Sequence, residues 1–277
     1  MDEQEFYRRH SPLTDPGEHR ARLRGLPTDV AALGAIVRGA VLHRDETSWL
    51  HGFELPAQRR DEANTRWTRA ILDHLGDLRE RPAPQRFAGT CRDFSILLCA
   101  LLRESGTPAR LRAGFAGYFT TDFFDDHWVV EYWSDRHGWR LADAQLAGGA
   151  AEAYRADVDP LDVPRDAFLV GGAAWRDCRR GDRDPARFGV FSAGLTGMWE
   201  VQGNVLRDLA ALAKVETLPW DNWGLIEPHF DTLGDGDREL LDGAAAVSAA
   251  GGPADAAAAL LDSDDRLRPP TALVAPH

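Results

Sequence analysis

The chain has 277 residues, 44% of them hydrophobic, which allows a sizeable core and one large domain or a core with additions. Its formal net charge of −12 disfavours nonspecific binding to nucleic acid or to an anionic membrane, since both attract positive charge. Three cysteines, an odd number, do not form a disulfide framework. The acidic start is unlike a secretory leader, and no apolar run reaches the roughly 18 residues that span a bilayer, so we expect a cytoplasmic protein.

The first part of the chain predicts mainly helices. Thr28 or Asp29 can cap a short helix. Residues 44–52 are expected to form a loop, and a proline then favours the start of a helix over residues 57–78. We therefore expect residues 1–80 to be a helical extension that packs on the domain that follows.

The next stretch predicts a helix over residues 91–102 with a cysteine in its first turn. Thr90 can cap its N-terminus, and Asp93 stands where a capping box places its second acceptor. Apolar residues then recur at helical spacing, and Gly106 with the proline two residues later ends the helix. Cys91 would lie at the positive end of the helix dipole, which favours the nucleophilic thiolate.

Three strands are expected after this helix, over residues 109–120, 126–133 and 138–143. A turn-rich loop separates the last two, so they predict a hairpin that sets His127 and Asp143 side by side. A cysteine at a helix start, a histidine on one strand and an aspartate on the next correspond to a nucleophile, a base and an orienting acid. The predicted catalytic residues are Cys91, His127 and Asp143.

The remaining residues carry weaker signals. We expect residues 147–262 to be a C-terminal extension of the same domain, with a helix over residues 198–214 and two alanine-rich helical pieces around Gly251. Residues 263–277 contain three prolines and predict a frayed tail.

Four segments together resemble the core of the transglutaminase-like superfamily, as found in bacterial transglutaminase-like domain proteins. They are Gly-Thr-Cys-Arg-Asp-Phe at 89–94, the stretch 106–115, Asp-His-Trp-Val-Val-Glu at 126–131 and Trp-Arg-Leu-Ala-Asp at 139–143. This family shares the Cys, His, Asp order of papain-like cysteine enzymes. The resemblance implies an α+β fold in which the catalytic helix packs on an antiparallel sheet, within a core over residues 81–146 and with extra helices at both ends.

The oxyanion hole has three candidate donors: the backbone N–H of Cys91, the side chain of Gln85 and the indole N–H of Trp67. Gln85 precedes the cysteine by six residues, as the corresponding glutamine does in papain-like enzymes. Trp128 fits a strand wall that excludes water from the site, and it is a candidate substrate contact.

Three arginines have two possible roles. The first is structural: Arg92, Arg110 and Arg112 pair with Asp93 or Glu131. The second is binding of a substrate carboxylate or phosphate. Pairing is the favoured interpretation for all three, and Arg92 is the candidate for substrate binding.

An acidic loop that contains Asp122, Asp125 and Asp126 comes just before His127. The resemblance raises the question of calcium, because animal transglutaminases depend on it, but the loop lacks the alternating ligands and closing glutamate of a calcium loop. We therefore expect no metal and no other cofactor. Adjacent strand residues point to opposite faces, so Asp126 should face away from the partner of His127, which favours Asp143 as that partner.

The sequence thus predicts a cysteine-dependent enzyme that transfers an acyl group from a peptide, amide or thioester substrate through a thioester intermediate. Hydrolysis and transfer to an amine differ only in the final acceptor, and the three residues do not distinguish them. The alternative is a non-catalytic binding or scaffold protein that retains a transglutaminase-like fold.

Overall fold

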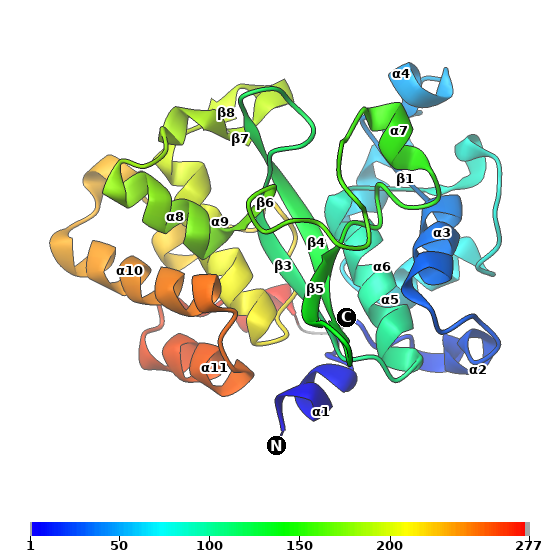
Figure 1. Ribbon diagram of the computed structural model, residues 1–277, viewed down its shortest axis with the longest axis horizontal. Coiled ribbons are helices and arrows are strands. Elements are labelled where there is room, and N and C mark those ends of the chain that lie inside the picture. Colours follow the sequence, from blue (N-terminus) through cyan, green and yellow to red (C-terminus); the bar gives the residue numbers. More distant parts are fainter. Residues whose placement is uncertain (1, 275–277) are drawn as a thin grey trace. The chain divides into compact units, whose positions relative to one another are not determined.

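The computed structural model describes residues 2–274 and divides the chain into two compact units (Figure 1). The first unit comprises Met1–Arg110 and Val129–Val163, and the second comprises Leu111–Trp128 and Pro164–His277. Each unit therefore contains two separate segments of the chain.

The first unit surrounds one long helix, α6, whose residues Cys91 to Arg103 are all buried. Helix α3 packs against α6 and contributes the buried Leu33 and Val37. The helices of this unit are α1 (Glu3–Arg8), α2 (Arg20–Leu23), α3 (Val30–Ala40), α4 (Thr47–His51), α5 (Thr68–Leu75), α6 (Cys91–Glu104) and α7 (Ala150–Tyr154), with 3-10 turns η1 (Gly17–His19), η2 (Ala57–Asn64) and η3 (Ala83–Gln85).

Two strand pairs complete the first unit. The short strands β1 (Val41–His43) and β2 (Phe87–Gly89) are parallel and lead into α4 and α6. The second part of β4 (Phe124–Ser134) pairs antiparallel with β5 (Gly138–Ala142), from Val130 opposite Ala142 to Ser134 opposite Gly138. This register confirms the predicted hairpin, and it places Asp143 directly after the last paired residue of β5.

The second unit is a helical layer with short strands. Helix α9 carries the buried Val205 and Leu209. Helices α8 and α10 pack against it and contribute Trp175 and Leu241. Figure 1 draws these three helices in colours from yellow-green to orange. Its helices are α8 (Gly171–Arg180), α9 (Met198–Leu212), α10 (Asp235–Ala250) and α11 (Ala254–Ser263), with 3-10 turns η4 (Pro185–Arg187), η5 (Phe191–Ala193), η6 (Gly224–Ile226), η7 (Phe230–Thr232) and η8 (Thr271–Leu273).

The strands of the second unit pair in both directions. Strand β3 (Ala109–Ala116) is antiparallel to β6 (Phe168–Val170), whereas the first part of β4 is parallel to β7 (Phe188–Val190), which is antiparallel to β8 (Leu195–Thr196). The six-stranded sheet to which these strands and β5 belong is therefore mixed. Helices with a mixed sheet confirm the α+β prediction. The β3–β6, β4–β5 and β7–β8 pairs are antiparallel as expected, and the β4–β7 pair is parallel.

Several predicted elements are confirmed. They include α6 with its end before Gly106, α9 over most of residues 198–214, and the two alanine-rich helices α10 and α11 on either side of Gly251. Of the two candidate caps for α3, Asp29 is the one used: its side chain accepts from the Ala32 N–H at 2.8 Å. The strand expected over residues 109–120 ends earlier, at Ala116.

Two expectations for the first unit are wrong. The loop expected over residues 44–52 contains helix α4, which ends at Gly52 in the left-handed conformation. The single helix expected over residues 57–78 is divided into η2 and α5. The division has a tertiary cause, because the Arg92 guanidinium donates to the backbone carbonyls of Thr65 and Arg66 at 3.2 and 2.7 Å, between the two pieces.

The end of the chain is ordered as far as it is described. Leu267 is buried, and η8 follows it, whereas residues 275–277 of the expected tail lie outside the described residues. The expected division of the chain after residues 80, 146 and 262 stays a prediction. Within residues 2–274, no helix is both long and apolar enough to cross a membrane.

Candidate active site

Cys91 is the first residue of α6, and it is 8% exposed. The predicted capping box surrounds it: Thr90 comes just before the cysteine, and the Asp93 carboxylate, two residues after it, accepts from the Thr90 N–H at 2.8 Å. Gly89 makes room for this bond, because a Cβ at residue 89 would lie 2.7 Å from side-chain atoms of Asp93. Cys91 thus lies at the N-terminus of a fourteen-residue helix, where free N–H groups and the helix dipole favour negative charge.

Arg92, the residue after the cysteine, makes several contacts within the first unit. Arg92 is fully buried, and its guanidinium contacts Asp93 at 3.4 Å in addition to the Thr65 and Arg66 carbonyls. Burial raises the pKa of Asp93 to about 6, although the Arg92 charge and the bonds from Thr90 oppose that rise. These contacts favour pairing over the substrate-binding role considered for Arg92.

The other two arginines are also paired. The Arg110 guanidinium donates to Glu131 at 2.8 Å and to Glu3 at 2.9 Å within the first unit. Arg112 donates to both carboxylate oxygens of Asp208, at 2.9 and 2.8 Å, within the second unit. Both arginines are 1% exposed. Arg110 pairs with Glu131 as expected, whereas Arg112 pairs with Asp208, which was not among the expected partners.

Asp143 is held in a turn directly after β5. It is 1% exposed, its own N–H donates to the Pro160 carbonyl at 2.7 Å, and its Oδ1 accepts from the Gln145 N–H at 2.9 Å. The last bond is an Asx turn, in which an aspartate side chain fixes the backbone two residues on. The turn therefore restrains one oxygen of the Asp143 carboxylate.

His127 lies on β4 in the part that belongs to the second unit, and it is 3% exposed. Three aromatic rings of that unit flank the imidazole: Phe119, Tyr118 and Phe168, at centroid distances of 4.9, 6.1 and 6.4 Å. Trp128 beside it is fully buried, which suits a wall that excludes water better than a direct substrate contact.

Asp126, the acidic neighbour of the histidine, is committed elsewhere. Its carboxylate accepts from the Asn204 side-chain amide at 3.2 Å, on α9. Burial raises the pKa of Asp126, and it also raises the pKa of nearby Glu200, to about 7 with help from the Asp126 charge. The alternation of faces along a strand therefore accounts for Asp126 pairing with α9.

The candidate oxyanion donors differ in exposure. Gln85 is exposed at the end of η3, whereas Trp67 is half-buried just before α5. The backbone N–H of Cys91 lies in the first turn of α6, where N–H groups have no partner within the helix.

The three predicted catalytic residues thus occupy ordered positions in different units. Cys91 and Asp143 belong to the first unit, and His127 belongs to the second. Cys91 lies at a helix start, Asp143 follows the last strand of a hairpin, and His127 lies among aromatic rings. The triad itself stays a prediction.

A polar network next to Asp143 was not predicted. Gln145 donates through Nε2 to the Tyr154 hydroxyl at 2.9 Å, and that hydroxyl donates to Glu46, which also accepts from Arg38 at 2.6 Å. Sequence spacing could not reveal it, because Glu46 and Tyr154 are 108 residues apart.

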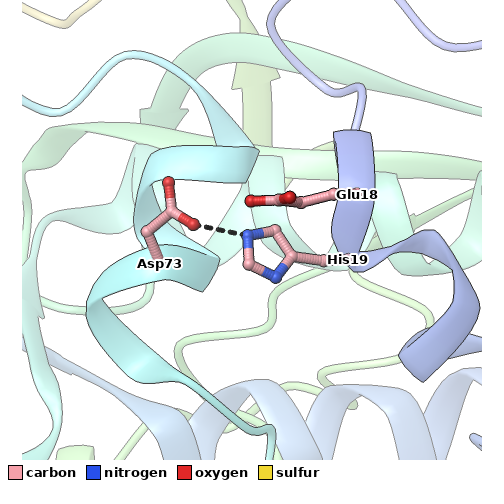
Figure 2. A group of neighbouring side chains, drawn as sticks. All are labelled: Glu18, His19 and Asp73. Carbon is pink, nitrogen blue, oxygen red and sulfur yellow. Dashed lines mark hydrogen bonds and ion pairs between the residues drawn. The ribbon is translucent and has the colours of Figure 1, made fainter.

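A second cluster in the first unit combines Glu18 and His19 on η1 with Asp73 on α5 (Figure 2). Their ligand atoms lie within 4.8 Å of one another, and an imidazole with two carboxylates is a donor set that zinc accepts. However, His19 Nε2 already bonds Asp73 at 2.6 Å, and among the described residues His19 Nδ1 has no partner. Metal-binding histidines usually anchor that second nitrogen. The cluster therefore serves to connect η1 to α5.

Comparison with known proteins agrees with the resemblance seen in the sequence. Residues 74–144 match the model of the transglutaminase-like superfamily, so the chain contains a transglutaminase-like region, and this region includes Cys91, His127 and Asp143. A protein-glutamine gamma-glutamyltransferase from Pseudomonas aeruginosa is 28% identical over 136 residues, which cover 43% of this chain. The matched part is only 20% of that relative's length.

A solved structure of a candidate cysteine protease from Cytophaga hutchinsonii aligns with 61% of this chain and 46% of its own chain. The TM-score is 0.36 and the sequence identity is 16%.

Proposed function

We propose that the protein is a cysteine-dependent acyl-transfer enzyme. The observation that carries the proposal is the position of Cys91, in the first turn of a capped helix within the region that matches the transglutaminase-like superfamily. A helix start favours the thiolate, and the thiolate is the nucleophile.

The proposed reaction has two steps. The Cys91 thiolate attacks the carbonyl carbon of an amide or thioester, and as the carbonyl re-forms, protonated His127 gives its proton to the leaving amine or thiol. A thioester on Cys91 remains. Water or an amine, deprotonated by His127, then attacks this thioester and releases Cys91 with an acid or a new amide. Asp143 would accept from the imidazole and stabilise its charged form.

The name of the Pseudomonas aeruginosa relative suggests a first substrate class to test. Protein-bound glutamine is an amide, and its carboxamide would release ammonia in the first step. Glutaminyl peptides are therefore the first amides to test, beside simple thioesters.

The experiment detects the acyl-enzyme by intact-mass spectrometry. Wild type, Cys91→Ala and the control Cys178→Ala are incubated with a glutaminyl peptide or an alkyl thioester, with and without a primary alkylamine. We expect an adduct in wild type and Cys178→Ala and none in Cys91→Ala. An adduct that persists in Cys91→Ala would refute the proposal, and the ratio of acid to amide products identifies the acceptor.

The second candidate is a non-catalytic binding or scaffold protein. The low exposure of Cys91, His127 and Asp143, at 8%, 3% and 1%, favours it, because a substrate must reach the sulfur. A complete absence of adducts, together with a Cys91 that resists small alkylating agents, would support this alternative.

A further inference from the structure

A chain of hydrogen bonds in the first unit connects the Asp143 turn to a buried ion pair. Asp143 Oδ1 accepts from the Gln145 N–H, and Gln145 Nε2 donates to the Tyr154 hydroxyl. The hydroxyl donates to Glu46, which pairs with Arg38. No step of the proposed reaction uses Gln145, Tyr154 or Glu46.

The charge of Glu46 fixes the direction of the two hydrogen bonds made by the Tyr154 hydroxyl. Burial alone would raise the pKa of Glu46, but the Arg38 charge and the bonds from Arg38, Tyr154 and the His43 N–H outweigh burial and lower it. An ionised carboxylate only accepts, so the Tyr154 hydroxyl must donate to it. Burial and the Glu46 charge also raise the pKa of Tyr154, which keeps the phenol protonated.

The same logic determines the orientation of Gln145. Because the Tyr154 proton is directed to Glu46, its oxygen is left to accept, and Gln145 must present its NH2 group. Gln145 is 5% exposed, and within residues 2–274 its Oε1 has no hydrogen-bond partner. Gln145 therefore makes two of the bonds in this chain: its side-chain Nε2 donates to Tyr154, and its backbone N–H donates to Asp143.

Several contacts hold Glu46, at the other end of this chain of hydrogen bonds. Glu46 is 1% exposed and accepts from Arg38 on α3 at 2.6 Å, from the His43 N–H at 2.9 Å, and contacts His51 on α4 at 3.2 Å. Such a satisfied buried network specifies one geometry. Tyr154 connects this anchor to the short helix α7 and to the Asp143 turn.

We propose that Tyr154 is a positioning residue: through Gln145 it holds the Asp143 turn against the Glu46 anchor, and so sets the orientation of the Asp143 carboxylate. The part of this proposal that concerns catalysis rests on the proposed function, since Asp143 then acts on His127. The part that concerns the turn does not.

Tyr154→Phe removes the hydroxyl and retains the ring, whose edge contacts Trp49 at a centroid distance of 5.1 Å. The variant leaves a Glu46 oxygen and the Gln145 amide without their shared partner, so the turn should open more often. Trp49→Leu is the matched control, because it removes the ring contact and leaves the hydrogen bonds intact. Gln145→Leu breaks the chain one bond nearer to Asp143 and should reproduce the effect of Tyr154→Phe.

The first measurement is amide hydrogen exchange in the full chain. We expect the Gln145 N–H to exchange about tenfold faster in Tyr154→Phe and Gln145→Leu than in wild type, with no change in Trp49→Leu. An unchanged exchange rate at Gln145 in Tyr154→Phe would overturn the proposal, whatever the activity of the protein.

The second measurement is the rate of Cys91 alkylation by iodoacetamide at pH 7, mapped by peptide mass spectrometry. We expect Tyr154→Phe to lower it about tenfold, because a small misplacement of the orienting group weakens the site. If Tyr154 acts through Asp143, adding Tyr154→Phe to Asp143→Asn causes no further loss, whereas effects that multiply would overturn that link. An unreactive wild-type Cys91 with faster exchange in Tyr154→Phe would refute the proposed function and support the positioning of the turn.

Discussion

The buried pair of Arg112 and Asp208 decides whether Arg112 is structural or available to a substrate anion. Asp208 is 0% exposed and accepts four hydrogen bonds: two from Arg112, one from the Ala113 N–H at 2.9 Å and one from the Ser248 hydroxyl at 2.6 Å. The pair connects β3 to α9 and α10. Asp208→Leu would leave the Arg112 charge buried without the carboxylate that balances it, because the Ser248 carbonyl, which accepts from Arg112 at 2.7 Å, carries no charge.

The expected change in the free energy of unfolding follows from leaving one charge of the buried pair without its partner. Breaking a buried ion pair by removing one partner costs about 3–5 kcal/mol, because the remaining charge cannot return to water. Replacing both partners with apolar residues of similar volume is often nearly neutral. We therefore expect Asp208→Leu to lower the free energy of unfolding by about 4 kcal/mol, and Arg112→Met with Asp208→Leu by less than about 2 kcal/mol.

Urea denaturation followed by tryptophan fluorescence and by circular dichroism measures both variants and the Arg112→Met single variant. The cycle gives the coupling energy of the pair. If Asp208→Leu costs less than about 1 kcal/mol, or if the double variant costs as much as the two single variants together, then Arg112 is not held by this pair and the pairing argument fails.

Two further predictions concern pH and packing. Glu200 has a pKa of about 7 when folded against an ordinary value of 4.5, because of burial and the Asp126 charge. The folded protein therefore keeps a proton that the unfolded chain releases between these values, so stability falls by up to about 3 kcal/mol as pH rises from about 4.5 to about 7. Glu200→Gln should flatten this slope in urea midpoints at pH 5 and 8, and a slope as steep as that of wild type would contradict the assignment. Gly89→Ala should cost about 1–3 kcal/mol, because its Cβ overlaps Asp93. Gly243→Ala, on α10 with no atom within 4 Å of its Cβ, should instead be neutral or stabilising by about 1 kcal/mol. Equal effects of the two substitutions would argue against the tight fit at Gly89.

The sequence predicted the elements that depend on residues close to one another in the chain. The α6 capping box, the stop before Gly106 and the β4–β5 hairpin each depend on residues that are close in the sequence, and each was predicted. The pairing of Arg110 with Glu131 was also within reach, because both lie on strands and opposite charges were expected to meet.

Tertiary contacts explain what the sequence did not reveal. The helix expected over residues 57–78 is interrupted where Arg92 binds two backbone carbonyls, and those carbonyls come some 26 residues earlier. Glu46 comes just before helix α4, and nothing in the local sequence distinguishes it from a surface glutamate. In the structure it is buried and bonded to Arg38 and Tyr154. No spacing rule connects such residues. The parallel pairing of β4 with β7 likewise depends on strands more than 60 residues apart.

The most direct test of the account compares how fast iodoacetamide alkylates the three thiols of the native protein. Cys99 is fully buried, and burial together with the Asp177 charge raises the pKa of Cys178 to about 12, so at pH 8 about one Cys178 thiol in ten thousand is ionised. The account predicts that Cys91, despite being more buried than Cys178, reacts at least about tenfold faster than either. A Cys91 that reacts no faster than Cys178 would contradict its role as the nucleophile.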